Sequence, residues 1–514
     1  MIGSPVHFRR RASATRASAA AVVLALLALS GCGGGQSAAE PTVTKPVSAV
    51  APAGPTSRML DQLRLVNYYP STGGWNLMWT RWNPTKIDHD FARIAGLGGN
   101  AVRIIIQPSA VGFPEISPTM SSRLGDLVSM ARSHGLKVQL TLFDLWDDYH
   151  DTSQSSTWAA SVLADYRSDP EVAFVELQNE INPYVPAAMS WARKELPILR
   201  SLCGTVPVTV SVTGTDTSTT LTALKAGLQG DQPDFYDVHF YGPAGSAYSQ
   251  FAEDKAIAAP LPLIVGETGY PTMADVAGSE PAAEANQDLY LRSVMWAAQS
   301  LALPVPAPWI FQDFTADAIP SNLHARPSEY HLGLIRTDGS AKIAAASMQA
   351  VFTSGEVSTT TNLDFTLGYQ GVPLYWQRYD RGQGTFLWTP TGSPSGGGSV
   401  GLTDTSGTSA AVPSYTLDPV EVPIKAGETF TAGAWVRSVA ATGFNRISIA
   451  WFGASGLYLG QSESPAAPLG TTGWTQLAVV SSAPAGAQYE QLNLKSAHNS
   501  GTIWFSDATI SPED

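Results

Sequence analysis

The sequence has little cysteine and little charge. Among 514 residues only Cys32 and Cys203 are cysteines, which excludes a small fold held together by several disulfides. Charged residues make up 14% of the chain, and 30 basic against 43 acidic side chains give a net charge of −13. This balance argues against nucleic acid or an anionic membrane surface as the main partner. Cys203 lies in the stretch LRSLCGTVPV, where we expect it to be a small buried hydrophobic residue.

The N-terminus carries a short apolar segment that is too short for a membrane-spanning helix. This segment, residues 19–29, follows a basic region that includes Arg9 and Arg16, which predicts an export signal over residues 1–32. It ends in Leu-Ser-Gly-Cys at 29–32, which resembles the bacterial lipobox. The resemblance implies lipidation of Cys32 and an exported protein anchored by lipid to the outer face of the cytoplasmic membrane. The alternative is an ordinary cleaved signal and a secreted protein.

Residues 33–57 are rich in Gly, Ala, Pro, Ser and Thr, which is typical of a flexible tether. Over residues 58–355, eight short apolar runs recur at intervals of roughly thirty to forty residues, each followed by helix-like sequence, and this alternation predicts a (β/α)8 TIM barrel. The runs are residues 63–69, 100–106, 137–143, 172–178, 206–212, 235–241, 261–267 and 306–312. A doubly wound open sheet is the alternative. Its phosphate loop would follow the first strand, whereas GLGGN at 96–100 lies after a helix and before a strand.

Polar residues gather where these apolar runs end. In a barrel, the C-terminal ends of the strands converge on one mouth, so Glu180 and Glu267 would project into one cleft. The complete set of strand-end residues is Arg103, Asp144, Trp146, Asn179, Glu180, His239, Tyr241, Glu267 and Trp309. Paired carboxyl groups suit the cleavage of a glycosidic bond, because one donates a proton while the other attacks or activates water. Arg103 is placed to keep the attacking carboxylate ionised.

Five motifs in this order, NAVRI, VELQNE, DVHFYG, LIVGETG and PWIFQDF, together resemble clan A glycoside hydrolases, nearest the cellulase-like family five. The resemblance covers roughly residues 60 to 350 and implies retention of anomeric configuration. It implies Glu180 as acid/base, Glu267 as nucleophile, Asn179 bonding the sugar 2-hydroxyl, Arg103 and Tyr241 positioning the nucleophile, His239 in the network around the acid/base, and Trp309 as a sugar platform. The chain departs from the family after the third run, where Phe143, Asp144 and Trp146 stand in place of a common histidine. This departure leaves the specificity of the adjoining subsite open.

The loop after the first run is rich in aromatic residues that could stack on sugars, although half or more of them are expected to pack the loop against the barrel. They are Tyr68, Tyr69, Trp75, Trp79 and Trp82. The acidic stretch DLWDDYHD, residues 144–151, lacks a calcium-loop spacing, so we expect a solvated loop. No paired-histidine zinc motif is present, and the predicted chemistry requires neither a metal nor a cofactor.

Residues 356–514 alternate apolar and polar positions between Gly, Pro and Ser turns, which predicts an antiparallel β-sandwich. Motifs such as AGAWVRS and GTIWFSDATI resemble jelly-roll carbohydrate-binding modules and the galactose-binding-like sandwich. Two roles are possible for this domain on the sequence alone: it binds sugar, or it is a structural cap on the barrel. Of Trp435, Trp451 and Trp504, we expect at least two to fill the core.

The sequence as a whole predicts a retaining glycoside hydrolase that cleaves β-linked polysaccharide or oligosaccharide. One alternative is an exo-glycosidase or transglycosylase that acts on cell-envelope glycans. Another is a non-catalytic, sugar-binding surface lipoprotein. The intact set of Glu180, Glu267, Arg103 and Asn179 counts against a dead barrel. The loops determine which sugar and which linkage are cleaved and whether cleavage is endo or exo. The strand-end motifs therefore do not predict this specificity.

Overall fold

The computed structural model describes residues 55–513, apart from residues 215, 278, 324, 360, 370, 380–383, 405–412, 418–423 and 454–456. The predicted signal, its Cys32 and nearly all of the predicted tether therefore lie outside the described residues. In the described part of the chain, no helix combines the length and apolar character needed to cross a membrane.

Short parallel strands form the first domain. They pair in the orders β1-β2-β3-β4-β5 and β6-β7-β8, and each carries one of the predicted apolar runs. The strands are β1 Leu65–Asn67, β2 Ala101–Ile105, β3 Lys137–Phe143, β4 Val172–Gln178, β5 Val208–Thr209, β6 Ser211–Gly214, β7 Tyr236–Phe240 and β8 Leu263–Thr268. The strands β5 and β6 flank Val210 and together form the fifth run.

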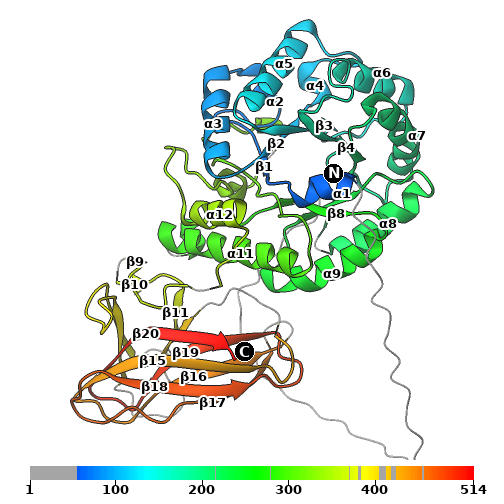
Figure 1. The fold of residues 1–514 in the computed structure, drawn as a ribbon. Coiled ribbons are helices and arrows are strands. Elements are labelled where there is room, and N and C mark those ends of the chain that lie inside the picture. The colour runs from blue at the N-terminus through cyan, green and yellow to red at the C-terminus, as the bar shows by residue number, and fades with distance from the viewer. Residues whose placement is uncertain are drawn as a thin grey trace, which may run out of the picture. The chain divides into compact units, whose positions relative to one another are not determined.

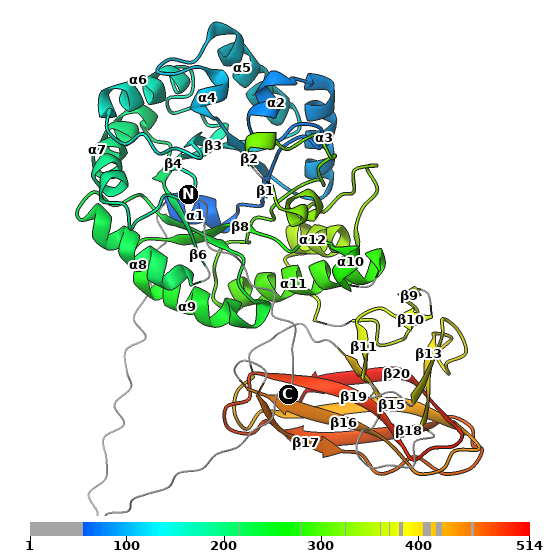
Figure 2. The same ribbon diagram turned by 180° about the vertical axis from the view of Figure 1, so that it is seen from behind.

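The eighth run, residues 306–312, closes the ring without forming a regular strand. On one side, the Ala307 backbone N–H donates to the Val265 carbonyl at 2.9 Å. On the other, the Phe311 N–H donates to the Asn67 carbonyl at 3.1 Å. Figure 1 shows the strands inside a ring of helices, and Figure 2 shows the same ring from behind. The predicted TIM barrel is thereby confirmed.

From α2 onward the helices follow the strands along the chain, and some of them begin at a side chain that caps the helix N-terminus. Asn83 accepts from the Lys86 N–H at the start of α3, and Ser279 accepts from the Ala282 N–H at the start of α11, so each satisfies an otherwise unpaired donor. The helices are α1 Pro55–Asp61, α2 Asn76–Thr80, α3 Pro84–Gly96, α4 Pro108–Val111, α5 Pro118–Ser133, α6 Thr152–Val162, α7 Pro186–Cys203, α8 Thr217–Leu228, α9 Ala247–Ala258, α10 Ala274–Ala277, α11 Glu280–Ser300 and α12 Ile343–Ser354. Short 3₁₀ turns are η1 Ala244–Ser246, η2 Ser321–Leu323 and η3 Pro327–His331.

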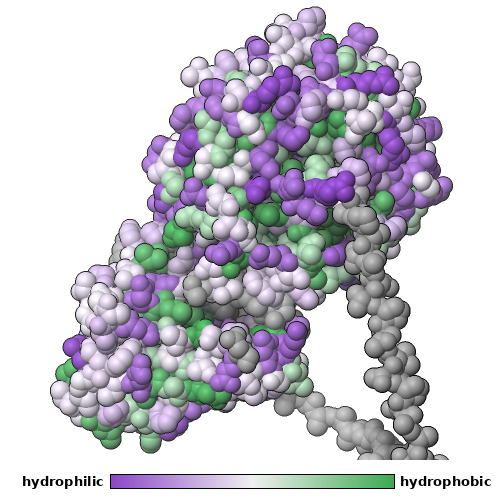
Figure 3. Space-filling model, viewed as in Figure 1, coloured by the Kyte–Doolittle hydropathy of each residue, from purple (hydrophilic) through white to green (hydrophobic). Residues whose placement is uncertain are grey.

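Apolar side chains fill the space between strands and helices and also one end of the barrel interior. Leu65, Phe174, Phe235 and Ile264 belong to a separate buried cluster, and all of them lie at or near the starts of their strands. Glu180 and Glu267 lie toward the other end of the barrel, where the strands finish. Cys203 is 1% exposed, as predicted for a buried hydrophobic residue. On the barrel face seen in Figure 3, hydrophilic and neutral surface predominates over scattered hydrophobic patches.

The C-terminal part forms two antiparallel five-stranded sheets with an apolar core, which confirms the predicted β-sandwich. One sheet has the order β11-β14-β19-β16-β17, and the other, which we call the second sheet, has the order β12-β13-β20-β15-β18. The strands are β9 Gly368–Tyr369, β10 Val372–Pro373, β11 Trp376–Tyr379, β12 Gly384–Thr389, β13 Ser399–Asp404, β14 Ser414–Leu417, β15 Thr429–Val439, β16 Phe444–Phe452, β17 Tyr458–Glu463, β18 Thr475–Ser482, β19 Tyr489–Ala497 and β20 Thr502–Pro512.

The prediction that at least two of three tryptophans fill this core is wrong. Trp451 is 2% exposed within the core, but Trp435 and Trp504 are partly exposed and lie outside it. The reason is strand alternation, because Ala434 and Val436 on β15 already occupy the inward positions and Trp435 therefore points to the other face.

Candidate active site

A buried arginine stands at the centre of the polar cluster. The Arg103 side chain, on β2, is fully buried, and its Nη2 donates to Glu176 Oε2 at 2.6 Å and to Asn179 Oδ1 at 2.7 Å. Its Nη1 donates to Asn67 Oδ1 at 3.1 Å and forms a short ion pair with Glu267. The carboxylates of Glu176 and Glu267 raise the pKa of Arg103 against the effect of burial, so the guanidinium is a fixed cation.

Glu267, at the end of β8, is held on three sides. The Tyr241 hydroxyl donates to its Oε2 at 2.9 Å, and Arg103 and His239 Nδ1 approach its Oε1, the latter at 3.4 Å. Burial raises the pKa of Glu267, and the positive charge of Arg103 acts in the opposite direction. Of the two catalytic candidates, Glu267 is therefore the carboxyl group with a direct cationic partner.

Glu180 follows β4 and reaches the same cavity from the opposite side of the ring. Its backbone φ of 47° lies in the left-handed region, which is unusual for a residue other than glycine, and Ser211 Oγ accepts its backbone N–H at 2.8 Å. The carboxyl contacts His239 Nδ1 at 3.0 Å, and one oxygen each of Glu180 and Glu267 lie within 4.8 Å of each other. Burial raises the pKa of Glu180, which favours its protonated form.

His239 lies between the two glutamates and is neutral. Its side chain is fully buried, and burial lowers its pKa to about 4 in spite of the neighbouring carboxylates. The imidazole is therefore uncharged at neutral pH, and its Nδ1 contacts the carboxyl groups of Glu180 and Glu267. The structure thus brings His239 into contact with Glu180, and its role in catalysis stays a prediction.

Asn179 and Asp144 extend the network toward the third strand. Asn179 Nδ2 donates to Asp144 Oδ1 at 2.9 Å, and Gln107 Nε2 donates to Asp144 Oδ2 at 2.8 Å. Asp144 is only 6% exposed, so the prediction of a solvated acidic loop is wrong for this residue. Asp151, from the same stretch, accepts the Gln154 N–H and begins α6. The network leaves the Asn179 amide between Arg103 and Asp144, beside Glu180 in the chain.

A second pair of carboxyl groups, Glu176 and Asp237, lies deeper in the barrel and was not among the predicted site residues. Both are fully buried, and ligand atoms of Glu176, Asp237 and His239 lie within 4.8 Å of one another. Arg103 lowers the pKa of Glu176, whereas burial and the charge of Glu176 raise that of Asp237. We therefore assign the negative charge to Glu176 and the proton to Asp237. An acidic residue inside an apolar strand, as in VAFVELQ and FYDVHFY, is the signal that could have revealed them.

Aromatic side chains form one wall at the mouth. Trp309 is 7% exposed and contacts Tyr69 edge-on, with ring centroids 6.0 Å apart, and Trp75 at 6.2 Å. Tyr68, Trp79 and Trp82 pack elsewhere, so half or more of the loop aromatics are structural, as expected. Trp146 packs against Phe113 and Phe143, which leaves its predicted contact with substrate a prediction.

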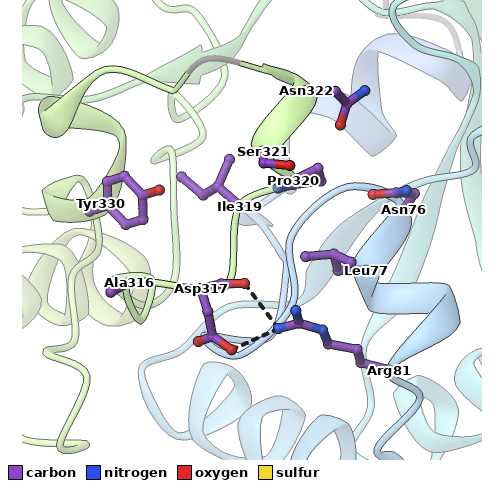
Figure 4. A pocket seen from close by; sticks show the side chains of 10 residues that line it. All are labelled: Asn76, Leu77, Arg81, Ala316, Asp317, Ile319, Pro320, Ser321, Asn322 and Tyr330. Carbon is purple, nitrogen blue, oxygen red and sulfur yellow. Dashed lines mark hydrogen bonds and ion pairs between the residues drawn. The ribbon is translucent and has the colours of Figure 1, made fainter.

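A cavity of about 490 Å³ lies between the loop after β1 and the segment that follows the eighth run, and none of the predicted site residues is among those that line it. Figure 4 shows polar groups placed around the apolar side chains of Ile319 and Pro320, with Arg81 bonded to Asp317 across one edge. The lining residues are Asn76, Leu77, Arg81, Ala316, Asp317, Ile319, Pro320, Ser321, Asn322 and Tyr330. Asn76 Oδ1 is buried there without a hydrogen-bond partner among the described residues.

Two groups in this cluster have the ligand types that a metal could use, namely Glu176, Asp237 and His239, and Glu180, His239 and Glu267. Arg103 already contacts Glu176 and Glu267 and supplies the positive charge in both groups. The donor set is therefore fitted to a guanidinium, and the acid–base chemistry of the pair requires no metal.

Two carboxyl groups meet at the C-terminal mouth of the (β/α)8 barrel, with Glu267 beside Arg103 and Glu180 beside the neutral His239. This is the arrangement that glycoside hydrolases use to cleave a glycosidic bond. Residues 66–300 match the family described as Cellulase (glycosyl hydrolase family 5). The barrel thus carries the model of this glycosyl hydrolase family over residues 66–300.

Similar solved structures include the exo-β-1,4-mannosidase Op5Man5 from Opitutaceae bacterium strain TAV5, at 20% identity and a TM-score of 0.48 over 57% of this chain and 59% of that chain. The GH5_18 enzyme from Streptomyces cattleya in complex with GlcNAc aligns at 17% identity and a TM-score of 0.45, covering 59% of this chain and 83% of that chain. The GH5_18 enzyme from Bifidobacterium longum subsp. infantis aligns at 18% identity and 0.47, covering 57% and 79%. No curated protein matches the chain.

Proposed function

We propose that the protein is a retaining glycoside hydrolase that cleaves β-glycosidic bonds in a polysaccharide or oligosaccharide. The observation that carries this proposal is the gap between the catalytic carboxyl groups, whose nearest oxygens lie within 4.8 Å. A separation of about 5 to 5.5 Å suits direct attack by one carboxylate, whereas about 6.5 to 9.5 Å leaves room for a water and gives inversion.

In the first step, a Glu267 oxygen attacks the anomeric carbon while the bond from that carbon to the leaving oxygen breaks. The leaving oxygen takes the proton of Glu180, whose pKa is raised by burial. In the second step, water gives a proton to Glu180 and attacks the same carbon, which releases Glu267. Arg103 and Tyr241 hold Glu267 in its ionised form before the first step and receive the free carboxylate again after the second.

We also propose that the cavity lined by Asn76 and Ile319 accepts a further sugar unit. Its volume of about 490 Å³ lies within the range of about 300–1,000 Å³ that is common for small-molecule sites. Neutral amide and hydroxyl groups from Asn76, Ser321 and Asn322 surround a small apolar floor, which suits a sugar ring and its hydroxyls. A transglycosylase would use the same catalytic pair and pass the sugar to a hydroxyl acceptor instead of water.

The first experiment is hydrolysis of aryl β-glycosides and of plant, fungal and bacterial envelope glycans by the wild type, Glu180→Gln and Glu267→Gln. Both variants should lose activity on natural glycans. Only Glu180→Gln should retain turnover of aryl glycosides with a good leaving group, because such a group departs without protonation. Glu253→Gln, on the exposed face of α9, is the matched control and should keep full activity. Activity that survives Glu267→Gln would remove the proposed nucleophile, and product analysis with an added sugar acceptor separates hydrolysis from transfer.

We also propose that the protein is exported and held to the outer face of the cytoplasmic membrane by a lipid on Cys32. The sequence Leu-Ser-Gly-Cys after a basic and then apolar segment supports this proposal. Cys32→Ala should move the protein out of the membrane fraction and abolish incorporation of labelled fatty acid, with Cys203→Ala as the matched control. Unchanged labelling of Cys32→Ala would contradict the anchor.

A further inference from the structure

The second sheet of the sandwich has an outer face that carries large aromatic side chains. Along β15, Ala432, Ala434 and Val436 are buried in the core, while the alternate residues Trp435 and Arg437 are partly exposed on the other side. The neighbouring strand β18 follows the same rule, since Val480 on its outer side is 57% exposed. Large aromatic groups on an exposed sheet face are not explained by core packing.

These side chains line up across the strands. Leu387 on β12 pairs with Gly401 on β13, Gly401 pairs with Trp504 on β20, and Trp504 pairs with Arg437 on β15. Because Val436 pairs with Thr475 on β18, the row continues to Trp474. With adjacent strands about 4.8 Å apart, a row over five strands is about 19 Å long.

Gly401 allows the Trp504 ring to lie along the sheet. A Cβ at position 401 would come within 3.2 Å of Trp504 Cδ2 and Cε3 and of the Leu387 Cβ, so the indole lies directly over the bare backbone of Gly401. A Cβ at this position would require the ring or its neighbours to shift by a few tenths of an ångström. The glycine therefore serves the orientation of the tryptophan, since its own backbone is in ordinary extended pairing with β12 and β20.

Arg437 lies between two indoles with its donors unused. Its Cζ is 5.3 Å from the ring centroid of Trp474 and 5.9 Å from that of Trp504. It forms no hydrogen bond or ion pair with any residue that the structure describes, and its Nε is buried without a partner. Arg446, on the other sheet, differs in this respect because its Nη1 bonds Glu463 at 2.8 Å.

We propose that this row, from Leu387 to Trp474 with Trp435 beside it, is a binding platform for a polysaccharide chain. Indole rings suit the C–H faces of sugar rings, and the guanidinium of Arg437 can donate to several hydroxyl oxygens at once. A row of about 19 Å across the sheet matches an extended glycan better than a single small ligand. The platform lies on a different domain from Glu180 and Glu267, so it would hold polymer and not take part in bond cleavage.

The test uses the full chain with Glu267→Gln added, so that the polysaccharide is not degraded during the measurement. Binding is measured by co-sedimentation with cellulose, chitin and bacterial envelope glycan, and by retardation in gels that contain soluble β-glucan, β-mannan or xylan. Arg437→Met and Trp504→Ala should each weaken binding at least tenfold. Gly401→Ala should weaken binding as well, although it removes no binding group, because it displaces Trp504. Phe444→Ala is the matched control, since Phe444 is an exposed aromatic residue beside an arginine on the other sheet.

A parallel measurement, with Glu267 intact, gives the KM and kcat for a small aryl glycoside. Both should be unchanged in Arg437→Met and Trp504→Ala, which shows that the barrel is intact and that any loss of polymer binding arises on the sandwich. The proposal is overturned if no polysaccharide in the panel binds, or if Arg437→Met and Gly401→Ala bind as tightly as the parent. A protein partner on this face would give that second result. The binding measurement does not depend on activity, so it can be interpreted even if the wild type hydrolyses none of the glycans.

Discussion

The sharpest test of the electrostatics beneath the active site is a matched pair of amide substitutions, Glu176→Gln and Asp237→Asn. Both side chains are fully buried and of similar polarity, yet we assign the negative charge to Glu176 and the proton to Asp237. Replacement of the ionised group should lower the stability of the protein strongly, and replacement of the protonated group should lower it only slightly. The two variants thus report which carboxyl group carries the charge.

Glu176 Oε2 accepts four hydrogen bonds, from Arg103 Nε and Nη2, Thr141 Oγ1 and Gln139 Nε2, at 2.6 to 3.0 Å. Loss of one partner of a buried ion pair costs about 3–5 kcal/mol. Arg103 keeps its contact with Glu267, so we expect about 3 kcal/mol, the lower end of that range. At roughly 2–4 °C per kcal/mol for a domain of this size, the melting temperature should fall by about 6–12 °C.

Asp237→Asn should cost less than about 1 kcal/mol, because the amide oxygen can still accept the Gly266 N–H that now bonds Asp237 Oδ1 at 2.8 Å. The pH dependence adds a second readout. A carboxyl group whose pKa is raised by folding stabilises the protein fully below its ordinary pKa of about 3.9, and this contribution is lost as the pH rises through the raised value. Asparagine cannot ionise, so the melting temperature of Asp237→Asn should gain on that of the wild type as the pH rises above about 4.

The assay is thermal unfolding of the wild type and both variants between pH 4 and pH 8. The reasoning is refuted if Glu176→Gln melts with the wild type while Asp237→Asn loses several degrees, because the proton would then reside on Glu176. It is also refuted if the difference between Asp237→Asn and the wild type is the same at every pH, since no raised pKa would then be linked to folding.

Three further predictions concern the same cluster. Tyr241→Phe removes the 2.9 Å hydrogen bond to Glu267 and should lower kcat/KM about 10- to 100-fold, the equivalent of about 1.5–3 kcal/mol for a bond to a charged group, with an unchanged melting temperature. Gly266→Ala would place a Cβ 2.3 and 2.5 Å from the Asp237 oxygens and should destabilise the protein by about 1–3 kcal/mol in chemical denaturation, whereas Gly230→Ala, which meets nothing within 4 Å, should not. In the pH profile of the wild type, kcat/KM should fall at alkaline pH as Glu180 loses its proton. With an activated aryl glycoside as substrate, Glu180→Gln should not show this fall. If the variant shows the same fall, another group is responsible for it.

Much of this arrangement follows from the sequence because strand ends in a barrel share one mouth. The runs that end at Asn179-Glu180 and at Glu267 were enough to place both glutamates together, and β4 begins and ends at the predicted residues. The deeper pair was not foreseen, since a single charged residue within an apolar run reads equally well as a strand that is solvated on one side. Only the position of Arg103, which contacts Glu176 below and Glu267 above, shows why these carboxyl groups can be buried.

The sandwich tryptophans show the opposite difficulty. Alternation identifies two faces of a strand, but it does not say which face is the core when both carry apolar residues. On β15 one face has Ala432, Ala434 and Val436, and the other has Trp435 next to Arg437. From the sequence, the larger tryptophan is the expected core residue. In the structure the small residues of β15 face inward, because side chains of the opposite sheet such as Trp451 fill the space between the sheets.

The buried site contains more carboxyl groups than cations, and this imbalance bears on which carboxyl groups carry a proton. Four carboxyl groups, Glu176, Asp237, Glu180 and Glu267, surround one fixed cation and a neutral histidine in a buried site. Like charges at this distance disfavour one another, and one guanidinium directly contacts only Glu176 and Glu267. The two carboxyl groups without that contact are Asp237 and Glu180, and burial raises the pKa of each. We therefore assign protons to these two groups. Asp237 is enclosed and holds its proton for stability, whereas the side chain of Glu180 is 32% exposed and can transfer its proton to a departing sugar. In the proposed mechanism, the position of Arg103 thus sets which glutamate attacks and which donates a proton.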